Sequence, residues 1–315
     1  MPFDFTAVKA PFRMQPGLRR LAEGTPQLTP NWLGSRALVE KLAVLSRHAD
    51  QALMATPGFD AGPAQRALVQ HAVAEQPEAL GWDGIGRFDA LHLGWSLLDD
   101  APHGTGPREI GACLHALPAQ WRLAALLSLS FAEDFAVIDG STGHIPWLAV
   151  CLPSHWAPEH KVGRHFAEVH APVADNQLLI TASDHLARLV TGHERWERFV
   201  WTITRHARLD SHPSRCEPGA WPSGTEADAN ALAARAHFRT ERQTFIPLPQ
   251  HRQAIFTIHV DVQPLAHAIV DPAQAQLLHD ALASMSASVL AYRGLAEVRD
   301  RLLSWLVARA SIPGA

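Results

Sequence analysis

Cysteine is scarce in this sequence, which limits the metal-cluster and disulfide chemistry available to it. Only Cys113, Cys151 and Cys216 occur among 315 residues, and none belongs to a CxxC pair. Such sparse and widely separated thiols exclude a disulfide framework, a zinc ribbon and a cysteine-ligated iron–sulfur cluster. The CxxCH motif of covalently attached haem is absent as well. Metal or haem chemistry would therefore use other ligands, and nineteen histidines are present.

Long apolar runs and blocks of basic charge are also missing. The segment MPFDFTAVKAPFRMQPGLRRL has no continuous apolar core like that of a signal peptide, and no stretch is long and apolar enough to span a bilayer. The formal net charge is −4 and no lysine/arginine block stands out, which argues against nucleic acid and anionic membranes as partners. We therefore expect a cytoplasmic protein whose partner is a small molecule or another protein.

Several familiar catalytic signatures are absent. The sequence contains no GxGxxG after a strand, no Walker loop, no HExxH and no GxSxG. Dinucleotide-binding, P-loop, zincin and α/β-hydrolase functions therefore lack their signatures.

The sequence predicts a single folded domain of the α+β class. Hydrophobic residues make up 47% of the chain, enough for a substantial core. Residues 1–34, with several prolines, predict an extended arm, and residues 35–140 a mainly helical part. We expect residues 141–270 to contain the sheet and residues 271–315 to contain C-terminal helices.

Periodicity locates the individual elements of this domain. Apolar residues at three- and four-residue steps predict a helix from Ser35 onward and further helices at 62–75, 87–98, 110–114, 121–137, 272–285 and 295–308. Apolar runs and alternating patterns predict strands at 145–152, 198–209, 238–248 and 254–265. The last two strands are separated by a short connection and therefore predict an antiparallel hairpin.

The passage from Leu152 to Val173, LPSHWAPEHKVGRHFAEVHAPV, carries four histidines and three prolines between a strand and a helix. A non-covalent haem needs one neutral imidazole on a rigid element, an apolar slot and cationic groups for its propionates. His170 fits the ligand role best because it ends a predicted helix over 161–170 and precedes Pro172. A histidine that stabilises the helix dipole is the more common explanation of this position.

Other residues of the same passage offer alternatives and partners. His155, His160 and His165 are neighbours that can take the place of His170 as ligand. Lys161 and Arg164 lie on the same predicted helix and are candidates for propionate binding, although solvated surface charges are the more common outcome.

The predicted strand RTERQTF places charged residues on both of its faces. Arg239, Glu241 and Gln243 share one face, and Arg242 lies on the other. One charged set must therefore point toward the covered side of the sheet or line a cavity, unless the strand is an exposed edge with a salt-bridge ladder. Arg198, at the start of the preceding strand, has the same two interpretations. Trp201 is either a core residue or a stacking surface for a flat cofactor.

Three long motifs, PFRMQPGLRRL, LPSHWAPEHKVGRHFAEVHAPV and FRTERQTFIPLPQHRQAIFTIHVDVQPL, occur in this order. In this combination the chain resembles the family of haem-dependent oxidative N-demethylase α subunits. The resemblance implies a PAS-like antiparallel sheet elaborated with helices, holding a b-type haem non-covalently. It implies monooxygenase-type, O2-dependent demethylation of a secondary amine, dimethylamine, to methylamine and formaldehyde. Electrons would come from NAD(P)H through a separate flavin and iron–sulfur reductase.

The residue patterns described above and the resemblance together assign roles to residues of this chain. His170 of the VHAPV motif is the expected iron ligand, and the other expected haem-binding residues are Lys161, Arg164, Arg239 and Trp201. The expected catalytic residues are Arg198, Glu241 and Arg242, with Glu241 suited to hold an alkylammonium group. The chain departs from the family pattern at Val200, where asparagine is expected, and at Ile246, where arginine is common. These departures leave the choice of amine open.

A second hypothesis is a haem-binding PAS-like sensor or redox protein without turnover. Charged residues converging on an open iron position favour catalysis. A second axial histidine such as His259, or an apolar distal side, favours simple binding or electron transfer.

Overall fold

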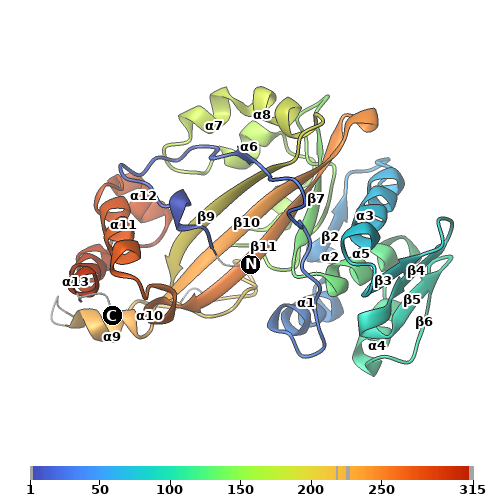
Figure 1. Ribbon diagram of the computed structural model, residues 1–315, viewed down its shortest axis with the longest axis horizontal. Coiled ribbons are helices and arrows are strands. Elements are labelled where there is room, and N and C mark those ends of the chain that lie inside the picture. The colour runs from blue at the N-terminus through green and yellow to red at the C-terminus, as the bar shows by residue number, and fades with distance from the viewer. Residues whose placement is uncertain (1–2, 218, 225–227, 312–315) are drawn as a thin grey trace.

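A seven-stranded antiparallel sheet forms the centre of the computed structural model, which describes residues 3–217, 219–224 and 228–311 (Figure 1). The ends of the predicted arm and of the predicted C-terminal segment, residues 1–2 and 312–315, lie outside this description. In spatial order the strands are β1 (Arg19–Arg20), β9 (Trp196–Thr204), β10 (His237–Leu248), β11 (Gln253–Pro264), β7 (Asp134–Asp139), β8 (Trp147–Ala149) and β2 (Leu53–Ala55). The predicted α+β class is confirmed.

The long hairpin of β10 and β11 is the backbone of this sheet. Its strands pair over their full length, from His237 opposite Pro264 to Leu248 opposite Gln253. A short 3-10 turn over Pro249–His251 and a left-handed Arg252 (φ 51°) close the hairpin. The alternating pattern in the sequence therefore predicted both the strands and their connection correctly.

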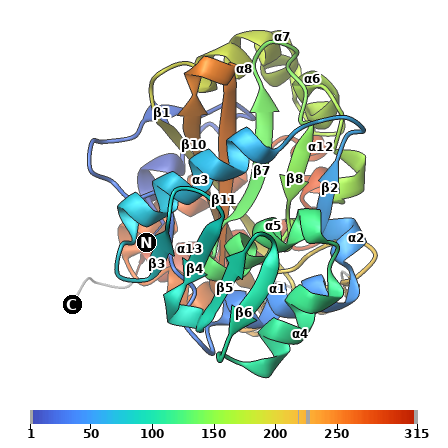
Figure 2. The same ribbon diagram turned by 90° about the vertical axis from the view of Figure 1, so that its right-hand side faces the viewer.

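Helices cover the two ends of the sheet and part of one face. The N-terminal helices lie at one end, namely α1 (Arg36–Arg47), α2 (Ala49–Ala52), α3 (Gly62–Glu75), α4 (Arg108–Ala116) and α5 (Ala119–Ser130). The other end carries α9 (Ala229–Ala233), α10 (Leu265–Ala268), α11 (Pro272–Ala283), α12 (Ala287–Tyr292) and α13 (Arg299–Ala310). The short helices α6 (Phe166–His170), α7 (Gln177–Thr181) and α8 (Ser183–Val190) lie together (Figures 1 and 2). Of these, α8 packs against β7, β10 and β11.

A second, four-stranded antiparallel sheet projects beside α4 and α5 (Figure 2). It consists of β3 (Leu80–Trp82), β4 (Arg87–Ala90), β5 (Trp95–Leu98) and β6 (Ala101–Gly104). The predicted helix over 87–98 is therefore wrong. Phe88 and Ala90 alternate with polar neighbours into the core, and Gly94 turns the chain at φ 69° between β4 and β5. The spacing of apolar residues over 87–98 was compatible with both a helix and short strands, because each strand is too short to show a clear period.

Two other predicted helices are shorter than expected. The apolar run over 121–137 divides into α5, which ends at Ser130, and the buried strand β7, because a continuous apolar run does not distinguish a buried helix from a buried strand. In the predicted helix over 161–170 only Phe166–His170 is α-helical. Gly163, at φ 72°, interrupts it.

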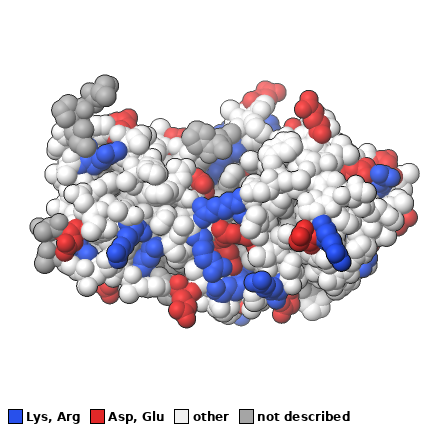
Figure 3. Space-filling view, turned by 90° about the horizontal axis from the view of Figure 1, so that it is seen from below, with Lys and Arg blue, Asp and Glu red and all other residues white. Residues whose placement is uncertain are grey.

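The described part of the N-terminal arm, from residue 3 onward, is mostly extended. Its strand β1 pairs with β9, with Arg19 opposite Glu197. Side chains of both charge signs share the surface, and a band of Lys and Arg crosses the middle of one face with Asp and Glu among them (Figure 3). No helix in the described part of the chain has the length and apolar character needed to cross a membrane.

Candidate active site

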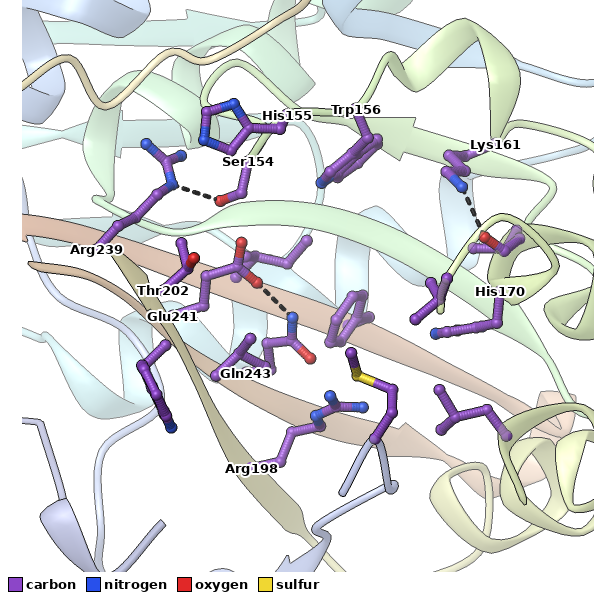
Figure 4. A pocket seen from close by; sticks show the side chains of 18 of the residues that line it. Ser154, His155, Trp156, Lys161, His170, Arg198, Thr202, Arg239, Glu241 and Gln243 are labelled. Carbon is purple, nitrogen blue, oxygen red and sulfur yellow. Dashed lines mark hydrogen bonds between the residues drawn. The ribbon is translucent and has the colours of Figure 1, made fainter. Parts of the chain in front are cut away.

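A cavity of about 590 Å³ lies between one face of the main sheet and the passage that leads into α6. This volume is in the range of pockets that hold cofactors and small ligands. Its wall is mainly apolar and includes Ala136, Ile138, Ile145, Leu148, Val150, Val169, Val173, Leu179, Leu186, Val190, Phe245, Phe256 and Ile258. The polar side chains in the wall come from the 154–170 passage, from β9 and β10, and from the end of α12 (Figure 4).

His170 points into this cavity from the last residue of α6 (Figure 4). Its Nδ1 lies 2.8 Å from the carbonyl oxygen of Phe166, which can only accept, so Nδ1 carries the proton and Nε2 has the free lone pair. Burial lowers the pKa of His170 to about 4, so the ring is neutral near pH 7. A neutral imidazole whose far nitrogen is fixed by a carbonyl is the arrangement that iron-ligating histidines use.

The backbone around His170 is held from several sides. The His165 ring accepts a hydrogen bond from the Ala167 amide, and the Glu168 carboxylate accepts one from the His165 amide, forming a capping box at the start of α6. Asn176 donates to the His170 carbonyl at 3.1 Å. His170 is thus presented by a short but clamped helix.

The other histidines of the passage are less suited to bind iron. His165 is used as the helix cap, and neither it nor His160 lines the cavity. His155 does line the cavity, but it belongs to no helix or strand, has φ 62°, and its Nδ1 lies 3.0 Å from Ser211 Oγ. It remains the alternative to His170.

Lys161 lies on the same side of the cavity as His170 (Figure 4). Its ammonium donates to the Val169 carbonyl at 2.6 Å, which leaves donors for a second partner. Burial lowers the pKa of Lys161. Arg164, predicted beside it, is exposed and does not line the cavity.

Arg198 reaches the cavity from β9 without a partner. In the described part of the chain its guanidinium makes no hydrogen bond or ion pair, and its Nε is buried and unsatisfied. Burial lowers the pKa of Arg198, while the nearby Glu241 carboxylate acts in the opposite direction. An unpaired guanidinium in an apolar cavity indicates that an anionic group binds there.

Glu241 and Gln243 line the cavity from β10, side by side on the face that alternation predicted. Gln243 Nε2 donates to Glu241 Oε2, and Oε1 has no protein partner among the described residues. The neighbours of Glu241 in the adjacent strands are Val200 and Val260, which offer no side-chain donor. One carboxylate oxygen is therefore free to bind a ligand.

Arg239, predicted to bind the cofactor, is almost fully used by the protein. It donates to Ser154 Oγ at 2.8 Å and to the carbonyls of Pro153, Arg208 and Leu209. It thereby ties β10 to the start of the 154–170 passage. Arg239 forms part of the cavity wall, but its donors are directed at backbone oxygens.

Arg242 and His259 lie on the opposite face of the sheet from the cavity. Arg242, predicted as catalytic, donates to Glu197 at 3.0 Å and to the Pro26 carbonyl. His259, considered as a second axial ligand, has its Nδ1 3.0 Å from Glu133 Oε1. Neither residue lines the cavity, so a second axial ligand at His259 is excluded by this placement.

Trp201 is a buried cavity residue that packs edge-on against Phe12. The cavity wall also contains Trp221, Tyr292 and Arg293, which sequence analysis did not identify. They come from a loop and a helix end without any periodic signal, so only the tertiary fold brings them here.

The residues present fit a non-covalently bound haem. A clamped neutral imidazole, a mainly apolar cavity and cations on its wall meet the requirements of a non-covalent site. In the described part of the chain, no three His, Cys, Asp or Glu side chains converge to hold a bare metal ion.

Comparison with known protein families agrees with this geometry. The sequence model described as "Haem-dependent oxidative N-demethylase, alpha subunit-like" matches residues 113–303, more than half of the chain. The match includes all the cavity residues discussed above and leaves out the N-terminal arm, α1–α3 and the small sheet. The chain therefore belongs to the haem-dependent oxidative N-demethylase, alpha subunit-like family.

Proposed function

We propose that this protein removes a methyl group from a small methylated amine with O2 and releases formaldehyde. Family membership indicates a haem-dependent oxidoreductase. The observation that carries the finer proposal is the pairing of His170, with its free Nε2, and a partly unsatisfied carboxylate, Glu241, in one mainly apolar cavity.

In this proposal His170 holds the iron of a non-covalent b-type haem, and Lys161 binds a propionate. A bound haem would supply O2 binding and activation, with O2 as the oxidant of the methyl group. Aliphatic side chains of β7, β8 and α8 exclude water from the macrocycle. Trp201 has no haem contact in this proposal, because its side chain lies on the same face of β9 as Phe199, opposite to Arg198 and Val200.

Glu241 binds the protonated amine in this account. A secondary amine is cationic at neutral pH, and a buried carboxylate with a free oxygen attracts it through a charge-assisted hydrogen bond. Gln243 fixes the second oxygen, so the carboxylate keeps one orientation. The amine's N-methyl group is thereby held within the cavity that His170 faces.

The reaction balances with two electrons and two protons from outside. One methylated amine, one O2, two electrons and two protons give the demethylated amine, formaldehyde and water. The alpha-subunit description implies a partner subunit, and we propose that electrons come from NAD(P)H through a separate flavin and iron–sulfur reductase. Three free and buried cysteines suit a reducing compartment, which supports a cytoplasmic location.

The polar sheet wall favours turnover over a non-catalytic haem-binding sensor or redox protein. Arg198, Glu241 and Gln243 all project into the cavity, and an apolar distal side would be expected if haem were only held or reduced.

The test is formaldehyde release and O2 consumption by the haem-loaded protein, supplied with a chemical reductant and a panel of methylated amines. We expect equal amounts of formaldehyde and demethylated amine for at least one amine. A haem-loaded protein that consumes no O2 with any methylated amine would leave the sensor or redox function.

A further inference from the structure

Building on the proposed function, we propose that the substrate is zwitterionic: it carries a carboxylate beside its methylated ammonium group, as an N-methyl amino acid does. Arg198 binds the carboxylate and Glu241 binds the ammonium group. The site would then prefer N-methyl amino acids to simple alkylamines.

The first observation is that the positively charged Arg198 guanidinium has no partner among the described residues. This guanidinium lines the cavity, its Nε is buried without a partner, and no carboxylate of the described residues pairs with it. A planar guanidinium matches the two oxygens of a carboxylate. A simple alkylammonium would bring a second positive charge near this arginine and leave it unpaired.

The second observation is that Arg198 and Glu241 are kept apart. Arg198 lies opposite Gln243 in the β9–β10 register, and Glu241 lies two residues further along β10, opposite Val200. Such diagonal neighbours are separated by roughly 7–8 Å between backbones. No ion pair joins Arg198 to Glu241 among the described residues, although the carboxylate influences the pKa of the arginine.

Gln243 lies between Arg198 and Glu241 and keeps their charges apart. Its amide donates to Glu241 from one side and lies across the strand pair from Arg198 (Figure 4). The two charges therefore do not neutralise one another. A ligand with a positive and a negative end a few bonds apart can contact both, and this is the charge pattern of an amino acid.

A haem propionate is the other carboxylate that can reach Arg198. Lys161 and Arg198 both lie near His170, and Arg198 also shares the sheet wall with Gln243 and Glu241 (Figure 4). Arg198 thus belongs to the group of residues that faces the amine. This placement favours the substrate as the source of the carboxylate.

The experiment is isothermal titration of the haem-loaded protein with three probes: N-methylglycine, N-methylglycinamide and dimethylamine. The amide matches N-methylglycine in size but has no negative charge. We expect N-methylglycine to bind about 10- to 100-fold more tightly than either of the other probes, the range typical of a hydrogen-bonded charge.

Three variants test whether Arg198 is the residue that recognises the carboxylate. Arg198→Met is expected to remove the preference for N-methylglycine over N-methylglycinamide, and to bind dimethylamine more tightly because the second positive charge is gone. Arg188→Gln, at an exposed arginine of α8, is the matched control and is expected to keep the preference. Arg198→Lys keeps the positive charge but loses the planar pair of guanidinium donors. It is expected to retain part of the preference for N-methylglycine.

Two results would overturn the inference. N-methylglycine binding no better than its amide in the wild type would show that no carboxylate is recognised. Loss of haem from Arg198→Met, with the fold intact by circular dichroism, would assign Arg198 to a propionate. Neither result concerns whether a methylated amine is demethylated, which the formaldehyde assay tests separately.

Discussion

Glu241 is the side chain on which amine binding depends in this account. We predict that Glu241→Gln raises KM for the amine about 10- to 100-fold, because the loss of a charge-assisted hydrogen bond to a buried cation costs about 1.5–3 kcal/mol. Steady-state formaldehyde release measures this. The control is Glu194→Gln, at an exposed carboxylate outside the cavity. An unchanged KM in Glu241→Gln would remove Glu241 from the substrate site.

Arg242 gives the opposite prediction, because its contacts are structural. It pairs with the buried Glu197 on the face away from the cavity. Arg242→Gln is expected to lower the free energy of unfolding by about 1–3 kcal/mol, the cost of leaving a buried acceptor without its donor. Urea unfolding provides the measurement. Normal stability combined with lost turnover would instead support the catalytic role expected from the sequence.

Sequence alternation was sufficient to place Arg239, Glu241 and Gln243 on one strand face. It did not reveal which face is covered, because that depends on the 154–170 passage packing against β10. The same limit applies to Arg198: its position in a strand was predictable, but its lack of a partner was not. Of the two departures from the family pattern, Val200 lies in the cavity wall, whereas Ile246 is buried in the main core.

At the scale of single elements, the start of α6 controls His170. His165 caps this helix through its ring nitrogen. We predict that His165→Ala weakens haem binding and lowers stability by about 0.5–2 kcal/mol, the usual cost of losing an N-cap. Because asparagine is a good N-cap, His165→Asn should restore both. Haem titration and thermal unfolding measure the two effects, and failure of the asparagine variant to rescue would rule out a capping role.

On the opposite face of the sheet, Glu133 connects the N-terminal arm to β11. Its carboxylate accepts from the Thr29 amide at 2.8 Å and lies 3.0 Å from His259 Nδ1. Burial alone would raise the pKa of Glu133, but the hydrogen bonds from His259 and Thr29 outweigh it and lower the pKa below 4.5. The Glu133 carboxylate therefore stabilises the protein fully at pH values above its pKa in the unfolded chain. This stabilisation is lost as the pH falls through its lower pKa in the folded protein.

The expected outcome is a stability difference between the wild type and Glu133→Gln that shrinks as pH falls below about 4.5. Urea unfolding of both proteins from pH 7 downward measures it. A difference that grows in acid would mean that the carboxylate is destabilised by folding, contrary to its contacts.

The elements themselves were predicted with uneven success, for physical reasons. The β10–β11 hairpin was recognised because each strand is twelve residues long and only a short connection separates the two. The strands over 87–98 were missed because each has only four residues, too short to show a period. The predicted helix over 161–170 shrank because Gly163 adopts a left-handed conformation that a helix does not contain.

The cavity is a property of the whole molecule. Its wall combines β7, the 154–170 passage, β9, β10 and residues 291–294, which are far apart in the chain. The three sequence motifs predicted the family and the passage that carries His170. They did not predict the contributions of Trp221, Tyr292 and Arg293, because these depend on how the C-terminal helices pack against the sheet.

The central claim is that His170 holds a haem in this cavity. The most direct test is the absorption spectrum of the purified protein, as isolated and after dithionite, compared with that of His170→Ala. We predict a Soret band that shifts on reduction in the wild type and is lost or strongly displaced in the variant. A spectrum unchanged by His170→Ala, or a wild-type protein that stays colourless after haem is added, would contradict the account.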